Sequence, residues 1–378
     1  MRKRGSPLIG LAVFLLFLLP ACGGGNGDDS GSSPTTTQAW TQQLGTPYND
    51  TGYGVALDGS GNIYITGSTG GNLDGNTSEG LLDIFLTKLP SSGNRIGSQQ
   101  FGTPGDDIAY AIAIDTSGNI YITGSSGGNL GTTSAGGLDI FLTKFDSSGN
   151  RIFTQQFGTN QDDIGYGVVV DNSGNIYITG STKGILGSSS FGLLDVFLAK
   201  FSSSWVNQFI VQFGSDQDDV GYSIALSGTD NIYITGSTVG NLPGNTNFGL
   251  TDIFLAKFNS SGQNQFLHQL GTTGRDIGNS VAVDGEGNVY AVGSTEGGLL
   301  GNSAFGMSDI FLVKFNSSGV TQFARQLGTP LNDIAYGLAI QGTDIYITGS
   351  TEGNLDGNTA FGQADIFLVK YDTSGVKK

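Results

Sequence analysis

The chain has few of the residues that form covalent cross-links and acid–base sites. Its 378 residues include one cysteine, Cys22, and one histidine, His268. A single cysteine excludes an intrachain disulfide, so packing and sheet pairing must hold the folded domain together. No second histidine, HExxH string or phosphate-binding glycine loop before a helix accompanies His268. The sequence therefore offers no nucleophile–base constellation, and we expect a protein that is not an enzyme.

Charged residues are also scarce, and most of them are acidic. They make up 13% of the chain, with 16 basic and 32 acidic residues and a net charge of −16. Without Arg2, Lys3 and Arg4, which lie in a segment that we expect to be removed, the net charge is −19. Such a surface repels phosphate backbones and anionic headgroups, so neither nucleic acid nor an anionic membrane surface is an expected partner.

The N-terminus has the composition of an export signal. Basic residues near the start precede an almost wholly apolar run over residues 8–19, which is too short to span a bilayer comfortably. We predict a signal peptide over residues 1–21. Its end, Leu19-Pro20-Ala21-Cys22, resembles the bacterial lipobox, which implies lipidation of Cys22. The alternative is an ordinary signal peptide followed by a chance cysteine.

Residues 22–38 are predicted to be a lipidated, flexible tether. Residues 23–37 contain only Gly, Ser, Asp, Asn and Thr with one proline, a composition typical of flexible coils. The lipobox resemblance implies a bacterial cell envelope, at the outer membrane or the cell surface. It also implies that the lipid anchor alone attaches the chain to the membrane.

Glycine is abundant, at 64 residues, but it lacks the three-residue period of collagen. It falls instead within a unit of 56–57 residues in which three strings return six times. In the first unit these strings are Gln-Leu-Gly-Thr from Gln43, Asn-Ile-Tyr-Ile-Thr-Gly from Asn62, and Asp-Ile-Phe-Leu from Asp83. Chance cannot keep three strings in step over six periods, so the chain is a repeat protein.

Each unit is predicted to form four short strands. In the first unit these cover residues 53–57, 63–66, 84–88 and 95–101, with turn-forming residues between them. Six such units predict an all-β fold, a six-bladed β-propeller of four-stranded antiparallel blades over residues 39–378. We expect the segment 40–46 to complete the last blade beside residues 365–371 and so close the ring.

The units resemble the bacterial SBBP β-propeller repeat. One copy reads Ala113-Ile114-Asp115, Ser117-Gly118-Asn119, Ile-Tyr-Ile-Thr-Gly over 120–124, Asp-Ile-Phe-Leu over 139–142, and Lys144. The resemblance covers residues 40–378. It implies the propeller fold and an envelope or extracellular setting, and it implies no defined reaction.

Two recurring positions could form a site at one mouth of the channel. An aspartate follows the glycine of each Gln-Leu-Gly string by five residues, and a tyrosine, or Asn279 in the fifth unit, comes three residues later. Carboxylates and aromatic faces could hold a cation or a sugar. Alternatively, each aspartate caps a turn and each tyrosine packs between blades. The positions are Asp50, Tyr53, Asp107, Tyr110, Asp163, Tyr166, Asp219, Tyr222, Asp276, Asn279, Asp333 and Tyr336.

The fifth unit departs most from the others, because it has Arg275 before its aspartate, Asn279 in place of tyrosine, and His268. We include Arg275 among the candidate ligand-binding residues. A lone histidine is more often solvated or packed than catalytic.

The long loops contain a faint calcium pattern, since oxygen-bearing side chains alternate as in a calcium loop, although the glycine is one position early. Asparagine and glycine are common in turns in any case. No cofactor other than calcium is suggested. The calcium candidates are Asn72, Asp74, Asn76, Asp83, Asn354, Asp356, Asn358 and Asp365.

These observations favour a non-catalytic, membrane-anchored module for binding or adhesion in the cell envelope, with an unidentified protein or glycan as its ligand. One alternative is a structural scaffold within an envelope assembly. Another is a propeller hydrolase or lyase, which would need convergent polar groups in the channel.

Overall fold

The computed structural model describes residues 12–13, 42–93 and 95–378. Nearly all of the predicted signal peptide, together with Cys22, the tether and Trp40, lies outside the described residues. Within the described part of the chain, no helix is long and apolar enough to cross a membrane.

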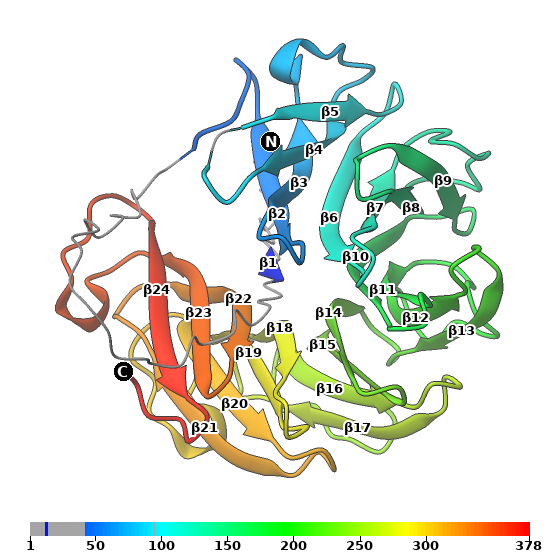
Figure 1. Ribbon diagram of the computed structural model, residues 1–378. Helices are drawn as coiled ribbons and strands as arrows, with labels where there is room; N and C mark the ends of the chain where they lie inside the picture. Colours follow the sequence, from blue (N-terminus) through cyan, green and yellow to red (C-terminus); the bar gives the residue numbers. More distant parts are fainter. Residues whose placement is uncertain (1–11, 14–41, 94) are drawn as a thin grey trace, which may run out of the picture.

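Six sheets surround a central axis, which confirms the predicted six-bladed propeller (Figure 1). The first strand of each blade lies nearest the axis, and the following strands run outward in chain order with antiparallel pairing. Short turns join the first strand to the second, and long loops join the second to the third. We call the disc surface with the short turns the turn face, and the surface with the long loops the loop face.

The strand bounds repeat closely from blade to blade. Blade one contains β2 (Asp50–Leu57), β3 (Ile63–Thr69), β4 (Asp83–Leu89) and β5 (Gly97–Phe101). Blade two contains β6 (Asp107–Ile114), β7 (Ile120–Ser126), β8 (Asp139–Phe145) and β9 (Arg151–Phe157). Blade three contains β10 (Asp163–Val170), β11 (Ile176–Thr182), β12 (Asp195–Phe201) and β13 (Asn207–Phe213).

The second half of the disc continues this order. Blade four contains β14 (Asp219–Ser227), β15 (Asn231–Thr238), β16 (Asp252–Phe258) and β17 (Asn264–Leu270). Blade five contains β18 (Asp276–Val283), β19 (Val289–Thr295), β20 (Asp309–Phe315) and β21 (Thr321–Leu327). Blade six contains β22 (Asp333–Gln341), β23 (Asp344–Thr351) and β24 (Asp365–Asp372). Three long loops include a 3₁₀ turn, at η1 (Leu73–Gly75), η2 (Leu299–Gly301) and η3 (Leu355–Gly357).

Each innermost strand has a β-bulge at the same place. In blade three, the pairing of β10 with β11 shifts between Gly165 and Gly167, which leaves Tyr166 as the extra residue. Opposite the bulge, a Cβ on Gly180 would lie 1.8 Å from the carbonyl oxygen of Ile164. The close approach of the two backbones therefore requires glycine at this point. The same contact explains the recurring glycines at Gly67, Gly124, Gly236, Gly293 and Gly349.

The hydrophobic core consists of five clusters, each between two neighbouring blades. Between blades four and five, for example, Ile253 and Leu255 of β16 pack with Val281 of β18. A blade has apolar side chains on both faces of its sheet, so it needs a neighbour on each side to remove them from water. The junction between blades is thus the main source of stability.

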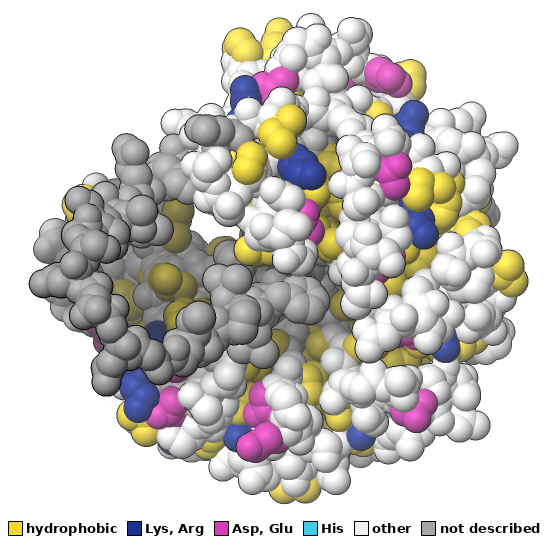
Figure 2. Space-filling view, in the orientation of Figure 1, with side chains coloured by type: hydrophobic (Ala, Val, Ile, Leu, Met, Phe, Trp, Pro, Cys, Tyr) yellow, Lys and Arg dark blue, Asp and Glu magenta, His cyan; other side chains and the backbone are white. Residues whose placement is uncertain are grey.

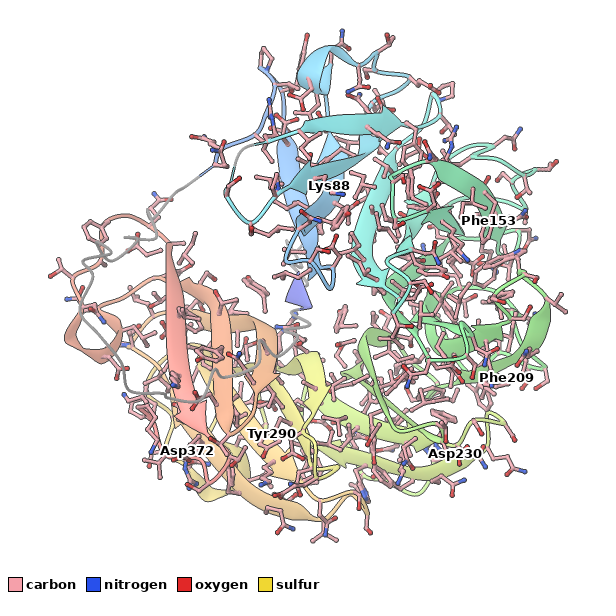
Figure 3. The ribbon with its side chains drawn as sticks, viewed as in Figure 1. Lys88, Phe153, Phe209, Asp230, Tyr290 and Asp372 are labelled. Atoms are coloured by element: carbon pink, nitrogen blue, oxygen red, sulfur yellow. The ribbon has the colours of Figure 1, made fainter. Side chains whose placement is uncertain are left out.

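Lysine and tyrosine side chains also join neighbouring blades near the turn face. The Lys200 ammonium lies 5.1 Å from the centre of the Tyr177 ring, which favours a cation–π interaction. The same ammonium donates to the carbonyl oxygen of Ser260 in blade four, at 3.0 Å. Lys88 and Tyr290, labelled in Figure 3, belong to equivalent pairs in blades one and five.

Blade six differs from the expected arrangement. It has three antiparallel strands, and the described residues 42–46 lie in no strand, so the structure lacks the fourth strand that we predicted beside β24. The sheet is extended instead at its inner edge, where β1 (Ala12–Val13) pairs in parallel with β22. Since β1 also contacts β2, it lies between the inner strands of blades six and one (Figure 1).

The junction between blades six and one is consequently open. Ile366 and Leu368 of β24 are 90% and 70% exposed, whereas their counterparts in blade five, Ile310 and Leu312, are 2% and 1% exposed. One apolar sheet face of blade six therefore has no neighbour among the described residues.

Replacing Gly180 with alanine should destabilise the propeller, because the added methyl group would meet the carbonyl oxygen of Ile164. We expect the free energy of unfolding to fall by about 3 kcal/mol, the range for severe overpacking. Chemical denaturation would measure it. The matched control is Gly285→Ala, since no heavy atom lies within 4 Å of that added Cβ. Equal effects of the two substitutions would contradict the close-approach explanation.

Candidate functional site

The six recurring aspartates do not form an open ring at the channel mouth, which corrects the first interpretation of the sequence. Each carboxylate turns into a blade junction, where its Oδ2 accepts a hydrogen bond from the backbone N–H four residues earlier. In blade two, Asp107 accepts from the Thr103 N–H at 2.5 Å and from its hydroxyl at 2.8 Å. The other five aspartates make the same backbone bond, at Asp50, Asp163, Asp219, Asp276 and Asp333. The six aspartates therefore cap turns, as the alternative interpretation of the sequence holds.

A second buried carboxylate, from the preceding blade, lies beside four of these caps, at Asp107, Asp163, Asp219 and Asp276. A Cβ on Gly214 would lie 2.6 Å from Asp195 Oδ1 and 2.7 Å from Asp219 Oδ2, so both carboxylates lie close to this glycine. Neither Oδ1 atom has a hydrogen-bond partner among the described residues. Burial raises the pKa of Asp219 to about 6 against the hydrogen bonds from Ser215, and the charge of Asp195 raises it further. Burial and the nearby Asp195 carboxylate therefore destabilise the ionised form of Asp219.

The tyrosines of the pattern, unlike the aspartates, do come together. Tyr53, Tyr110, Tyr166 and Tyr222 form a continuous arc of tilted or edge-to-face rings, with centroids 5.2, 5.1 and 5.5 Å apart. Burial raises the pKa of Tyr110 to about 12. The rings contact one another between successive inner strands, so their packing stabilises the wall of the channel.

The departures in the fifth unit also have structural roles. Asn279 interrupts the tyrosine arc and donates to the carbonyl oxygen of Ala335 in blade six, at 2.8 Å. Arg275 is exposed on the adjoining loop, where its backbone N–H donates to Glu296. His268 stacks on Phe266 with ring centroids 4.6 Å apart, and burial lowers its pKa. Tyr336, at the last position of the pattern, is half-buried.

The calcium candidates make hydrogen bonds and ion pairs with other residues of the protein. Asp74 pairs with Arg95, Asn76 donates its side-chain N–H to Leu73 and Ser98, and Asp83 accepts from Gln100. The second set is engaged in the same way. Asn354 accepts from Ala360, and Asp356 pairs with Lys377. Asn358 donates to Leu355, and Asp365 accepts from Phe361. Asn72 accepts from the Ser78 N–H. Among the described residues, no three His, Cys, Asp or Glu side chains are close enough to share a metal ion.

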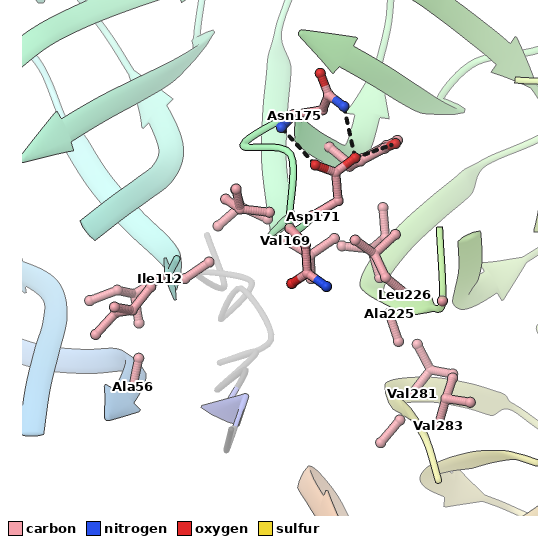
Figure 4. Close-up of a pocket in the computed structure, with 18 of the residues that line it drawn as sticks. Ala56, Ile112, Val169, Asp171, Asn175, Ala225, Leu226, Val281 and Val283 are labelled. Atoms are coloured by element: carbon pink, nitrogen blue, oxygen red, sulfur yellow. Dashed lines mark hydrogen bonds between the residues drawn. The ribbon is translucent and has the colours of Figure 1, made fainter. Parts of the chain in front are cut away.

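A cavity of about 510 Å³, lined by apolar side chains and by polar ones such as Asn175 and Lys200, opens at the turn-face end of the channel. Its wall is formed by the ends of the inner strands, including Ala56, Ile112, Val169 and Leu226 (Figure 4). Asp171 lies at its edge. Although burial alone would raise the pKa of Asp171, hydrogen bonds from Asn175, Ser173 and Tyr177 bring it below its ordinary value. With its oxygens already engaged, this carboxylate is a weak base and a structural cap.

The loop face has a feature that sequence reasoning missed. Exposed apolar side chains flank a glycine in the long loops of blades three, four and five, at successive blade junctions. Five of the six side chains are more than half exposed, while the related loop of blade two has Ala135 and Gly137 at these positions. We call the set the apolar arc: Phe191, Leu193, Phe248, Leu250, Phe305 and Met307.

Acidic side chains adjoin the apolar arc. Asp216 and Asp218 are exposed on the loop that receives the Phe191 loop, and the Leu193 N–H donates to the carbonyl oxygen of Gln217 between them. Figure 2 shows one side of the disc, where charged side chains are scattered singly and hydrophobic ones gather between blades. Since large apolar side chains in water mark interaction surfaces, the apolar arc is the best candidate for a binding site.

The comparison with protein families agrees with this architecture. Five segments match the family model described as SBBP, beta-propeller repeat: residues 39–74, 96–131, 152–187, 208–243 and 265–301. The chain is therefore a β-propeller protein built from SBBP repeats, as the resemblance implied. The structure adds a sixth blade beyond the five matched segments.

One curated relative is the regulatory protein FlaEY of Caulobacter vibrioides, which is 23% identical over 349 residues. The alignment covers 78% of this chain and 36% of FlaEY, so the chain spans only about a third of that protein. Solved structures with a similar fold include a PL25 ulvan lyase, at 13% identity, 85% and 81% coverage and a TM-score of 0.49. A luciferin-regenerating enzyme is 14% identical, with 86% and 94% coverage and a TM-score of 0.44.

The buried carboxylates should make stability depend on pH. Because folding raises the pKa of Asp219 to about 6, its ionisation opposes folding increasingly as the pH rises from about 4 to about 6. Asp219→Asn should remove this penalty and raise the free energy of unfolding at pH 7 by about 2 kcal/mol. Denaturation series at pH 4 and pH 7 would measure it. The control is Asp216→Asn, at an exposed carboxylate of the same loop. A lower free energy of unfolding for Asp219→Asn than for the parent at pH 7 would contradict the penalty assigned to the buried charge.

Proposed function

We propose that this propeller is a non-catalytic binding module of the bacterial cell envelope, and that it engages a protein partner through the apolar arc. The observation that carries the proposal is the exposure of these side chains at positions where blades one and two have Glu79 and Ala135; blade six continues the pattern with Phe361, which is 94% exposed. Phe191, Phe248 and Phe305 are 45–52% exposed. Exposed aromatic and aliphatic side chains cost solubility, so their presence at three successive junctions is explained by a partner that covers them.

The composition of the apolar arc favours a protein over a glycan. Each phenylalanine is followed, beyond a glycine, by an exposed leucine or methionine, which extends the apolar surface beyond the single stacking ring that a sugar uses. The exposed Asp216 and Asp218 nearby complement a partner that surrounds its apolar contact with basic residues. Such a surface also disfavours anionic membranes.

The channel supports a binding role more than a catalytic one. Its inner wall is apolar at the turn-face end, and the carboxylates expected at its mouth are buried as caps. His268 lies on β17 and stacks on Phe266, away from the inner strands.

The N-terminal sequence supports attachment to the envelope. Lipidation of Cys22 would hold the propeller at a membrane surface through the tether at residues 22–38. The tether joins the folded domain at residues 42–49, which lie on the loop face, where Tyr48 adjoins the Gly70–Gly71 backbone. Anchoring at this point would keep the apolar arc near the membrane, within reach of other envelope proteins.

Site-specific photo-crosslinking in the source cell tests the proposal. A photoreactive phenylalanine analogue at position 191, 248 or 305 should form an adduct with one discrete protein. The same analogue at Ala135, the related and exposed position in blade two, should form none. Equal labelling from all four positions, or from none of them, would contradict a partner on the apolar arc.

The triple variant Phe191→Ser, Phe248→Ser and Phe305→Ser should weaken binding to the crosslinked protein at least about tenfold, because buried aromatic anchors dominate interface energies. Titration of purified partner would measure this, with unfolding midpoints as the control for folding. Retention of the parent on a glycan array, lost in the triple variant, would instead assign the surface to a sugar.

A further inference from the structure

The six innermost strands end in aliphatic side chains that surround the channel at the turn face. Each of these side chains is half-buried and lines the cavity at that end of the channel. In blades two to six, each also packs against the core of a blade junction. We call this set the aliphatic collar: Leu57, Ile114, Val170, Leu226, Val283 and Ile340.

The cavity inside the aliphatic collar has the size of a small-molecule site and a lining suited to an aliphatic chain. Its volume of about 510 Å³ falls within the usual range of about 300–1,000 Å³. No phenylalanine or tryptophan is among the described residues that line it. Its one aromatic side chain, Tyr177, is 1% exposed. The wall therefore offers no flat surface on which a sugar or an aromatic ring could stack, whereas a flexible aliphatic chain can follow it.

An extended apolar segment already lies against one side of this wall. β1 pairs in parallel with β22, and Val13 lies opposite Leu338, which lines the cavity. Figure 4 shows the short arrow of β1 beside the residues of the cavity. The wall thus accepts a narrow apolar chain that runs along an inner strand.

The lining departs from sixfold symmetry in blade three. Val169 lines the wall where the other five blades have alanine, and the exposed Asn172 lies where blades one, four and five have glycine. Lys200, which also lines the cavity, is 8% exposed and is the most buried of the six recurring lysines. A residue that builds every blade recurs in every blade, so these three departures favour a ligand held against blade three.

The polar groups of the lining all belong to blades three and four. The Asp171 carboxylate is engaged by its own turn. Lys200 uses one of its three N–H donors on the carbonyl oxygen of Ser260. Its other donors and the amide of the exposed Asn172 suit a head group with oxygen acceptors at the same side of the cavity.

We propose that the cavity binds an unbranched aliphatic chain that ends in an anionic oxygen head group, as in a fatty acid or a lysophospholipid. The chain lies within the aliphatic collar, and its head group accepts hydrogen bonds from Lys200 and Asn172. This site is on the turn face, opposite the apolar arc, so its ligand does not compete with the proposed protein partner.

Equilibrium dialysis of the purified protein against radiolabelled fatty acids tests the proposal. Octanoate, decanoate and dodecanoate should each bind once per chain, about fourfold more tightly for each added CH₂ until the cavity is full. A parallel series of lysophosphatidylethanolamines shows whether the site takes a phospholipid head group or only a free carboxylate. Absence of saturable binding in both series would overturn the site.

Variants separate this site from general adhesion of apolar chains. Val169→Ala with Asn172→Gly gives blade three residues that other blades have, so the protein should fold normally. It should weaken dodecanoate binding at least about tenfold, because valine offers two more carbon atoms than alanine to the chain. Leu226→Asp should abolish binding, whereas Leu250→Asp, at an exposed loop-face leucine of the same blade, should leave it unchanged. Equal losses in these two aspartate variants would indicate adhesion and would overturn the site.

A photoreactive fatty acid locates the chain without any substitution. A dodecanoate analogue with a diazirine in mid-chain should label the inner strands, which mass spectrometry of the digested parent protein would identify. The expected peptides include residues 107–114, 163–170 and 219–226. Labelling confined to loop-face peptides that contain Phe248 or Phe305 would assign the binding to the apolar arc and would overturn the cavity site.

Discussion

The packing of each blade on the innermost strand of the next is the interaction on which the structure depends. It removes the apolar faces of the sheets from water. Within each blade a glycine allows the first two strands to approach, and in the complete blades a glutamine fixes the long loop; an aspartate then caps the turn that enters the next blade. These residues recur because each blade needs them. The repeated polar side chains therefore have structural roles in the disc.

This constraint separates structural residues from residues that are available for binding. Asp107, Asp163 and Asp219 have no exposed surface, and their oxygens face the protein interior. Phe191, Phe248 and Phe305 occupy loop positions where blades one and two have Glu79 and Ala135 and blade six has Phe361. Variation between blades at positions that the junction does not use is what a binding surface requires. The proposed partner site therefore follows the differences between repeats.

Much of the fold was readable from the sequence, because three strings in step over six periods define both the unit and the number of blades. The turn-capping role of the aspartates was available as an alternative, since a cap must recur in every blade. The apolar arc was not predictable. Phe191 and Phe197 both occur in apolar stretches, yet the first is 45% exposed and the second is fully buried, and only the path of the loop over the next blade distinguishes them. The open junction was also missed, because it depends on the pairing of β1 with β22.

The most direct test of binding through the apolar arc uses Met307, one of two methionines in the chain and the one beyond the predicted signal peptide. Its side chain is 59% exposed in the isolated propeller, so dilute peroxide should oxidise it readily to the sulfoxide. The rate of that oxidation should be compared between purified protein and intact cell envelopes, with free methionine as an internal standard. A partner on the arc predicts oxidation at least about tenfold slower in envelopes, because burial in an interface excludes the oxidant. Equal rates in the two preparations would show that the arc is uncovered where the protein works, and would contradict the proposed function.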